Sequence, residues 1–279
     1  MEVITFNEVV TKDLKCKLLS YYRIDMRSFN KTLEGMPAYA NCLLAAIDPA
    51  TDRIEHTYFV PQGAIFDKKE LSVLLDNKFN IEAMFFNAHI GSIPIFSVAE
   101  LKPVKVDTKE HFSPFFTLLR FETINSHFLK EHIVELTLET MSMHILRNLN
   151  EYYNDMVARL NQYFGNERLF KVLSYIHENL DKEISMEILG TEAGLSPDYV
   201  SQYFKRCLGL SIQSYLMDQR VKDALYQLVS TNDPLFTIAE QSAFVDQAYF
   251  NRRFKKFYNV IPLKVRKNYD LLAKQEHHS

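Results

Sequence analysis

The stretch SMEILGTEAGLSPDYVSQYFKRCLG, residues 185–209, predicts two short helices joined by a tight turn. Its opening serine is a candidate N-cap, and Ala193-Gly194-Leu195 supplies the turn. Ser196 can cap the second helix, with Pro197 at the first helical position, where a missing N–H costs nothing. Gly209 can end that helix in a left-handed conformation. This arrangement indicates a helix-turn-helix unit.

The pattern repeats about 50 residues further along the chain. Asp233-Pro234 starts a helix, a turn falls at residues 243–245, and Asp246 can cap the helix AYFNRRFKKFY. Residues 212–229 between the units have the apolar spacing of a connecting helix. Two such units at a fixed separation are typical of paired reading helices on DNA. The inner faces of the two reading helices are expected to carry Val200, Phe204 and Leu208 in one and Phe250, Phe254 and Phe257 in the other.

Residues across both units keep one spacing without gaps: Leu195, Ser196, Phe204, Lys205, Gly209, Arg220, Ala224, Ile238, Ala239, Phe244, Tyr249, Phe250, Arg252, Phe254, Lys255, Lys256, Pro262 and Arg266. With this set, residues 168–267 resemble the C-terminal DNA-binding domain of the AraC/XylS family of transcription regulators. Ala243 and Asn259 stand where that family usually has Gly, and Gly190 replaces an Ala. Asn tolerates a left-handed conformation, whereas Ala at positive φ would cost up to about 1 kcal/mol.

A reading helix places its outward N-terminal residues at base edges in the major groove, while flanking cations hold phosphates. Arg252 suits guanine, and Asn251 or Gln202 suits adenine; for each residue the alternative is a merely solvated helix face. The predicted base contacts are Asp198, Ser201, Gln202, Gln247, Ala248, Asn251 and Arg252. The predicted phosphate contacts are Lys205, Lys255, Lys256, Lys264, Arg266 and Lys267.

The charge is unevenly distributed in a chain whose formal net charge is −3. Residues 1–165 carry 17 basic and 21 acidic side chains, whereas residues 247–267 carry seven basic and no acidic ones. Residues 181–198, around the first unit, hold five acidic residues and one Lys. Because phosphates repel carboxylates, we expect the second unit to anchor the protein on DNA.

The first 108 residues predict short strands separated by turn signals, as in a sandwich or barrel. In pattern they resemble the family's cupin-like β-barrel sensor domain. Metal-binding cupins use a His-x-His motif that is missing here, since His56 and His89 are isolated. Phe59, Phe85, Phe86 and Phe96 are expected either to fill the core or to line an effector pocket.

Two helices, 114–125 and 127–156, are predicted next. The second carries an apolar stripe at helical spacing: Leu129, Ile133, Leu136, Leu138, Met141, Ile145 and Leu149. Such a stripe either covers the sheet or pairs with a second copy of the chain. The resemblance implies dimerisation in this segment, so we expect a homodimer through residues 127–156.

These readings predict an α+β protein with four parts. Residues 1–110 form a cupin-like β-barrel that senses an effector or partner, and 111–164 a helical dimerisation segment. Residues 165–270 form an all-α domain with two helix-turn-helix units, and 271–279 a tail. The resemblance implies a sequence-specific transcription regulator with double-stranded DNA and RNA polymerase as partners, a small-molecule effector, and no cofactor.

Several function classes are disfavoured by the composition. Only seven residues are Gly, and they form no phosphate-binding loop, which argues against dinucleotide oxidoreductases and P-loop NTPases. Three scattered Cys indicate a reducing compartment and no thiolate zinc site. The apolar runs are far shorter than the roughly 18 residues that span a bilayer, and no signal peptide is recognisable. We expect a cytoplasmic protein with no membrane partner.

Two alternatives concern the first half of the chain. It could be a metal-cupin enzyme domain, although His127, Glu131 and His132 fit no zinc-binding helix motif and no catalytic or metal-ligating set is recognisable. It could also be a protein–protein interaction module without a small ligand. The expectation we carry forward is a regulator and not an enzyme.

Overall fold

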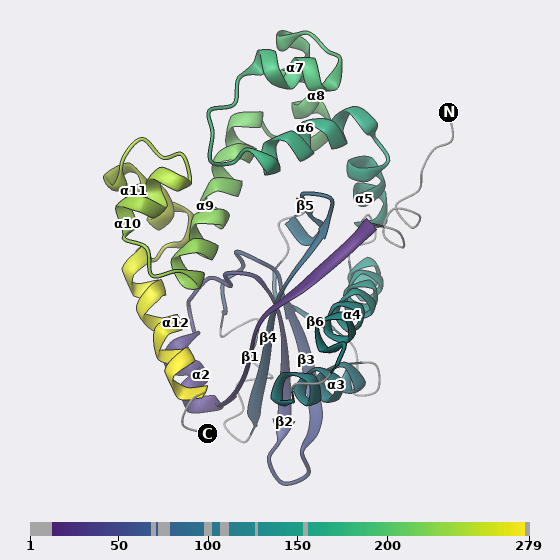
Figure 1. The fold of residues 1–279 in the computed structure, drawn as a ribbon, viewed down its shortest axis with the longest axis vertical. Coiled ribbons are helices and arrows are strands. Elements are labelled where there is room, and N and C mark those ends of the chain that lie inside the picture. Colours follow the sequence, from purple (N-terminus) through teal and green to yellow (C-terminus); the bar gives the residue numbers. More distant parts are fainter. Residues whose placement is uncertain are drawn as a thin grey trace. The chain divides into compact units, whose positions relative to one another are not determined.

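The computed structural model describes residues 13–67, 71, 79–97, 102–106, 112–125, 128–152 and 156–276 (Figure 1). The chain divides into two compact units, which we call the sheet unit and the helical unit. The sheet unit holds the described residues of 14–89, 94–154 and 263–279. The helical unit holds those of 1–13, 90–93 and 155–262.

The sheet contains six strands in the order β1-β4-β2-β3-β6, with β5 paired to β4. Strand β2 runs antiparallel to both β3 and β4, and β3 runs antiparallel to β6. The register places Ala45 of β2 opposite Thr57 on one side and Glu82 on the other. The strands are β1 (Leu14–Asp25), β2 (Asn41–Asp48), β3 (Arg53–Val60), β4 (Asn80–Ile90), β5 (Ile93–Pro94) and β6 (Val104–Val106), and the 3-10 helix η1 (Ile95–Ser97) follows β5.

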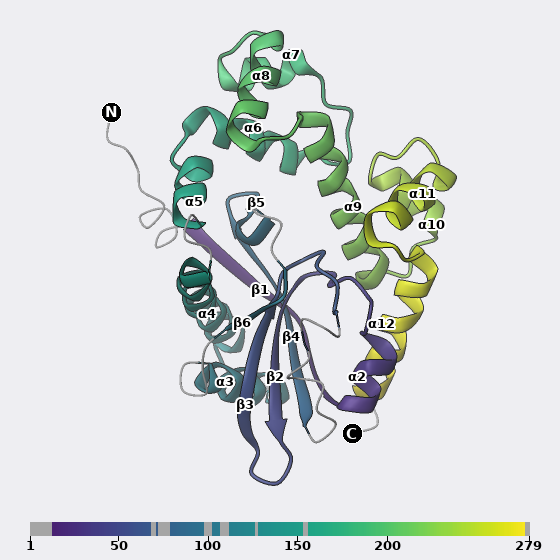
Figure 2. The same cartoon turned by 180° about the vertical axis from the view of Figure 1, so that it is seen from behind.

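Helices cover the two faces of this sheet from opposite sides (Figures 1 and 2). Helices α3 (Ser113–Ile124) and α4 (Lys130–Tyr152) lie on one face, and α2 (Met26–Thr32) and α12 (Pro262–Glu276) lie on the other. Neighbouring residues on a strand point to opposite faces, so Phe85 contacts Tyr39 while Phe86 contacts Phe96. The four phenylalanines expected in a core or a pocket are all buried and contact other rings: Phe59, Phe85, Phe86 and Phe96.

The apolar stripe predicted at residues 127–156 covers the sheet. Its later members, Leu138, Met141, Ile145 and Leu149, are fully buried as α4 packs on β1 and β6. Leu129 and Leu136 remain exposed. The expected start at His127 lies outside the described residues, and α4 ends at Tyr152 before α5 (Met156–Phe164) begins. Of the two roles left open for the stripe, covering the sheet is confirmed for this part of α4.

Helix α12 belongs to the sheet unit from Leu263 onward. The Tyr269 hydroxyl donates a hydrogen bond to the Pro37 carbonyl at 2.9 Å, and the Asn268 amide donates one to the Thr32 carbonyl at 2.8 Å. The Tyr269 ring is buried against Tyr39 and Phe85. The helix includes residues 271–276, which the sequence assigned to a tail.

The α+β class is confirmed, with a β-rich first part and an all-α part that contains two helix-turn-helix units. The helix predicted at residues 114–125 is present as α3 within one residue at each end. None of the helices in the described part of the chain combines the length and apolarity that crossing a membrane requires.

Candidate nucleic-acid interface

The first helix-turn-helix unit consists of α7 (Met186–Ala193) and α8 (Pro197–Leu208) in the helical unit. Ser196 caps α8, because its hydroxyl oxygen accepts a hydrogen bond from the Tyr199 N–H at 3.3 Å. Gly194 and Gly209 have φ values of 63° and 76°, so both adopt the left-handed conformation expected at the turn and at the end of α8.

The two helices approach each other closely at Gly190. A Cβ atom at this position would lie 2.7 Å from the Leu195 carbonyl oxygen, which is far inside van der Waals contact. Glycine is therefore required by the tight turn of this unit. This explains one of the three departures from the family pattern noted in the sequence.

The second unit consists of α10 (Leu235–Gln241) and α11 (Gln247–Tyr258). Asp246 caps α11 through a hydrogen bond that its carboxylate accepts from the Tyr249 N–H at 2.6 Å. Ala243 has φ of 52° and Asn259 has φ of 56°, so both non-glycine residues adopt left-handed conformations. The strain that the sequence predicted for Ala243 is thus present in the turn.

The turns of the two units differ by one residue. The Gly194 and Leu195 N–H groups donate to the Thr191 and Gly190 carbonyls, and Ala243 and Phe244 repeat this with Glu240 and Ala239. The N-caps of α8 and α11 are then 50 residues apart, although the preceding turn residues are 49 apart. The added residue is Val245, whose side chain is 91% exposed.

Helix α9 (Ile212–Ser230) connects the two units, which lie towards its opposite ends (Figures 1 and 2). Arg220 of α9 donates from Nε to the Leu180 carbonyl at 2.9 Å and also donates to the Lys182 carbonyl. Burial lowers the pKa of its guanidinium. Arg220 therefore secures the segment between α6 (Glu167–Glu178) and α7, and its role is structural.

The inward residues follow a spacing of four. Val200 and Phe204 are buried in α8, and Phe250 and Phe254 are buried in α11. The expectation that Phe257 faces inward is wrong, because its side chain is 42% exposed and Tyr258 takes the buried position. Four residues advance a helix by slightly more than one turn, so the face that holds positions 250 and 254 continues at 258.

The predicted base contacts lie mostly on exposed parts of the two reading helices, α8 and α11. Asn251 is the exception: it is half-buried, and its Oδ1 atom is buried with no hydrogen-bond partner in the described structure. The exposed ones are Asp198, Ser201, Gln202, Gln247, Ala248 and Arg252.

The predicted phosphate contacts separate into two groups. Lys205 of α8 and Lys255 and Lys256 of α11 are exposed in the last turns of the reading helices. Lys264 and Lys267 are exposed on α12, where Arg266 is half-buried, and α12 belongs to the sheet unit. The helical unit therefore brings together the first group with the base contacts, but not the second group.

Sequence reasoning missed a tyrosine–arginine cluster on α8. Arg206 Nη2 donates to the Tyr199 hydroxyl oxygen at 3.1 Å, and Cζ lies 5.8 Å from the ring centroids of both Tyr199 and Tyr203. On α11, Arg252 Cζ lies 5.9 Å from the ring centroid of Tyr249. Aligning the reading helices at their N-caps, which pairs Tyr199 with Tyr249, is the signal that would have found these contacts.

The electrostatic contrast predicted between the units lies on the surface. All five acidic residues of the segment 181–198 are exposed: Asp181, Glu183, Glu187, Glu192 and Asp198. The exposed cations of α11 have no acidic neighbour in that helix. The two reading helices thus present surfaces of different charge.

Known proteins resemble this interface region. A family model described as a helix-turn-helix domain matches residues 189–268. The Transposon Tn10 TetD protein of Escherichia coli is 32% identical over 97 residues, which are 35% of this chain and 70% of that protein. The arabinose operon regulatory protein of Escherichia coli (strain K12) is 33% identical over 100 residues, 36% of this chain and 34% of that protein. The structure of ToxT from Vibrio cholerae aligns with 93% of this chain and 99% of its own, at 12% identity and a TM-score of 0.49.

Proposed function

Because the chain belongs to the AraC/XylS family of transcription regulators, we propose that it binds double-stranded DNA at specific sequences through α8 and α11 and so regulates transcription. The observation that carries this proposal is the pair of capped reading helices that α9 joins within one compact unit. Each presents polar, exposed side chains opposite a buried apolar face.

Base reading is assigned to the outward residues of the first turns. Arg252 can donate two hydrogen bonds to guanine, and Gln202 can both donate to and accept from adenine. Asn251 can do the same once its amide rotates so that the buried Oδ1 reaches the base. Asp198, Ser201, Gln247 and Ala248 complete the base-reading surface that we propose.

Phosphate binding is assigned to cations that carry no sequence information. Lys205, Lys255 and Lys256 lie at the ends of the reading helices, where a phosphate backbone would pass. Lys264, Arg266 and Lys267 of α12 are proposed as further phosphate contacts. The exposed carboxylates of residues 181–198 weaken docking of the first unit, so we propose that α11 anchors the complex.

The first 110 residues are proposed to sense an effector or partner, and residues 111–164 to mediate homodimerisation. Exposed apolar side chains support a dimer surface at the end of α3 and the start of α4: Phe121, Ile124, Phe128, Leu129 and Leu136. The buried part of α4 is already used by the sheet. RNA polymerase is the further partner that family membership suggests.

A second reading of the first 110 residues is a protein-binding module without a small ligand. Within the described residues, no group of three His, Cys, Asp or Glu side chains is placed to hold a metal ion. Native mass spectrometry with a metabolite extract separates the two readings: a retained small molecule supports effector sensing, and a mass that stays unchanged favours the protein-binding module.

The DNA proposal is tested by selecting bound sites from random duplex DNA with the full chain, at two salt concentrations. We expect a motif with two half-sites about one helical turn apart for each monomer, and affinity that falls steeply with salt. A selected pool without a motif would contradict the proposal. Sedimentation of the same protein, with Leu136→Glu as the matched variant, tests the dimer.

A further inference from the structure

Arg206 is held at the surface of α8 by two tyrosines. Its guanidinium donates to the Tyr199 hydroxyl at 3.1 Å and lies over both tyrosine rings, whose centroids are 6.3 Å apart. Hydrogen bonding to Tyr199 raises its pKa further above the ordinary arginine value, so the group stays charged. The contacts recorded for Arg206 are with Tyr199 and Tyr203, which are neutral, so no carboxylate among them reduces its charge.

The position of Arg206 on α8 separates it from the base-reading residues. Helical geometry turns roughly 100° per residue, which places Asp198, Ser201, Gln202 and Lys205 on the side away from buried Val200 and Phe204. Arg206 and Tyr199 lie about a quarter turn from the centre of that side. When a reading helix sits in the major groove, its flanks face the sugar–phosphate backbones.

The second unit repeats this arrangement. Counted from the N-caps Ser196 and Asp246, Lys256 of α11 corresponds to Arg206, and Tyr249 corresponds to Tyr199. Each reading helix therefore carries a tyrosine in its first turn and a cation in its last turn on the same flank. The first unit, which is surrounded by exposed carboxylates, has the greater need for a fixed cation.

We infer that Arg206 binds a backbone phosphate of the DNA and that Tyr199 and Tyr203 are positioning residues that hold its guanidinium ready for that contact. This inference rests on the proposed function. A planar guanidinium stacked on a ring keeps free N–H donors at its edge, and phosphate oxygens accept them. Holding the side chain in advance reduces the conformational entropy lost on binding.

The test measures the affinity of the full chain for the selected DNA site, and for a duplex of random sequence, between 50 and 200 mM salt. Each phosphate contact contributes about 0.9 to the slope of log affinity against log salt. We expect Arg206→Ala to lower the slope by about one, so that over this range its affinity falls about 3.5-fold less than that of the wild type. The loss at low salt should be similar on both duplexes.

Matched variants isolate the contact. Lys105→Ala removes one exposed positive charge from β6 and should leave the slope unchanged. Arg206→Lys should keep the slope, and Tyr199→Phe should keep the slope while weakening binding several-fold, because only the positioning hydrogen bond is lost. Thermal unfolding establishes that each variant is folded.

The overturning results are distinct. An unchanged slope for folded Arg206→Ala contradicts the phosphate contact, as does a loss confined to the selected site. If the wild type binds no duplex DNA, the proposed function itself fails and this inference fails with it. If the wild type selects a motif but Arg206→Ala behaves like Lys105→Ala, only the inference fails.

Discussion

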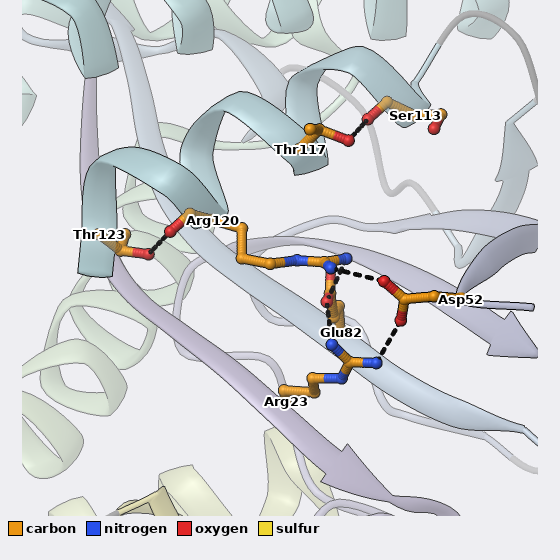
Figure 3. A network of polar contacts seen from close by, with 7 residues as sticks. All are labelled: Arg23, Asp52, Glu82, Ser113, Thr117, Arg120 and Thr123. Carbon is orange, nitrogen blue, oxygen red and sulfur yellow. Dashed lines mark hydrogen bonds and ion pairs between the residues drawn. The ribbon is translucent and has the colours of Figure 1, made fainter. Parts of the chain in front are cut away.

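Arg120 Nη2 of α3 lies 2.6 Å from Oε1 of Glu82, a fully buried carboxylate in the middle of the sheet (Figure 3). Arg23 of β1 approaches the same oxygen at 3.8 Å, and both arginines also pair with Asp52 in the β2–β3 turn. The network ties α3 to three separate parts of the sheet unit. It therefore fixes the helix that leads into the proposed dimer segment.

Replacing Arg120 with Met should destabilise the sheet unit by about 3 to 5 kcal/mol, because it removes the nearest partner of a buried charge. Urea denaturation of the variant measures this loss. The double variant Glu82→Gln with Arg120→Met should recover part of it, since no buried charge then remains unpaired. A single variant as stable as the wild type would contradict the role assigned to the ion pair.

His89 of β4 should make stability sensitive to mild acid. Burial lowers the pKa of its imidazole below the ordinary value of 6.5, so the unfolded chain takes up a proton at pH values where the folded chain does not. The stabilisation is present above pH 6.5 and is lost as the pH falls through the lowered value. The change in unfolding free energy between pH 7.5 and 5.5 should thus shrink in His89→Gln, while the exposed control His132→Gln retains it.

Ala243→Gly should stabilise the second helix-turn-helix unit. Alanine at a φ of 52° costs about 1 to 2 kcal/mol, and glycine loses about 0.5 to 1 kcal/mol of backbone entropy, so the net gain is roughly 0.5 kcal/mol. Thermal unfolding measures the difference. Ala239→Gly makes the same chemical change inside α10 and should destabilise the protein; equal effects of the two variants would refute the argument.

Gly190→Ala should destabilise the first unit by about 1 to 3 kcal/mol. The new Cβ would meet the Leu195 carbonyl at 2.7 Å, and backbone at that position cannot move aside without opening the turn. Denaturant unfolding of the variant, compared with Gly194→Ala at a site with open space but positive φ, separates steric crowding from backbone strain. Unaltered stability in Gly190→Ala would show that the turn is looser than described.

Arg252→Ala should weaken specific binding by about 1 to 3 kcal/mol and relax the preference at one base position, because its bidentate contact with guanine is lost. Titration against the selected site and its single-base variants measures both effects. Arg253, which is half-buried on the neighbouring position, provides the matched control Arg253→Ala. Full affinity and full base preference in Arg252→Ala would remove α11 from the base-reading role.

The helix-turn-helix units were predictable because their signals are local. N-caps at Ser196 and Asp246 and left-handed ends at Gly209 and Asn259 follow from residue types within one helix. The error at Phe257 arose from spacing that alternated between three and four residues. Tyr258 satisfies the period of the buried face, and nothing beyond that period was needed to identify it.

Other features depend on contacts between distant parts of the chain. Whether Leu138 and Leu149 cover the sheet or a second copy could not be decided from their spacing, because both roles require the same apolar stripe. Glu82 sits in a strand that reads as apolar, and its partner Arg120 is 38 residues away. The bond from Tyr269 to Pro37 spans 232 residues, and no local pattern encodes it.

The central claim is that α8 and α11 read two half-sites from one unit at a fixed separation. The most direct measurement is the affinity of the full chain for the selected site after five base pairs, about half a helical turn, are inserted between the half-sites. A fixed pair of reading helices predicts that affinity falls to that of a site with one half scrambled, and that a ten-base-pair insertion restores none of it within a monomer. Undiminished affinity after the five-base-pair insertion would contradict the claim.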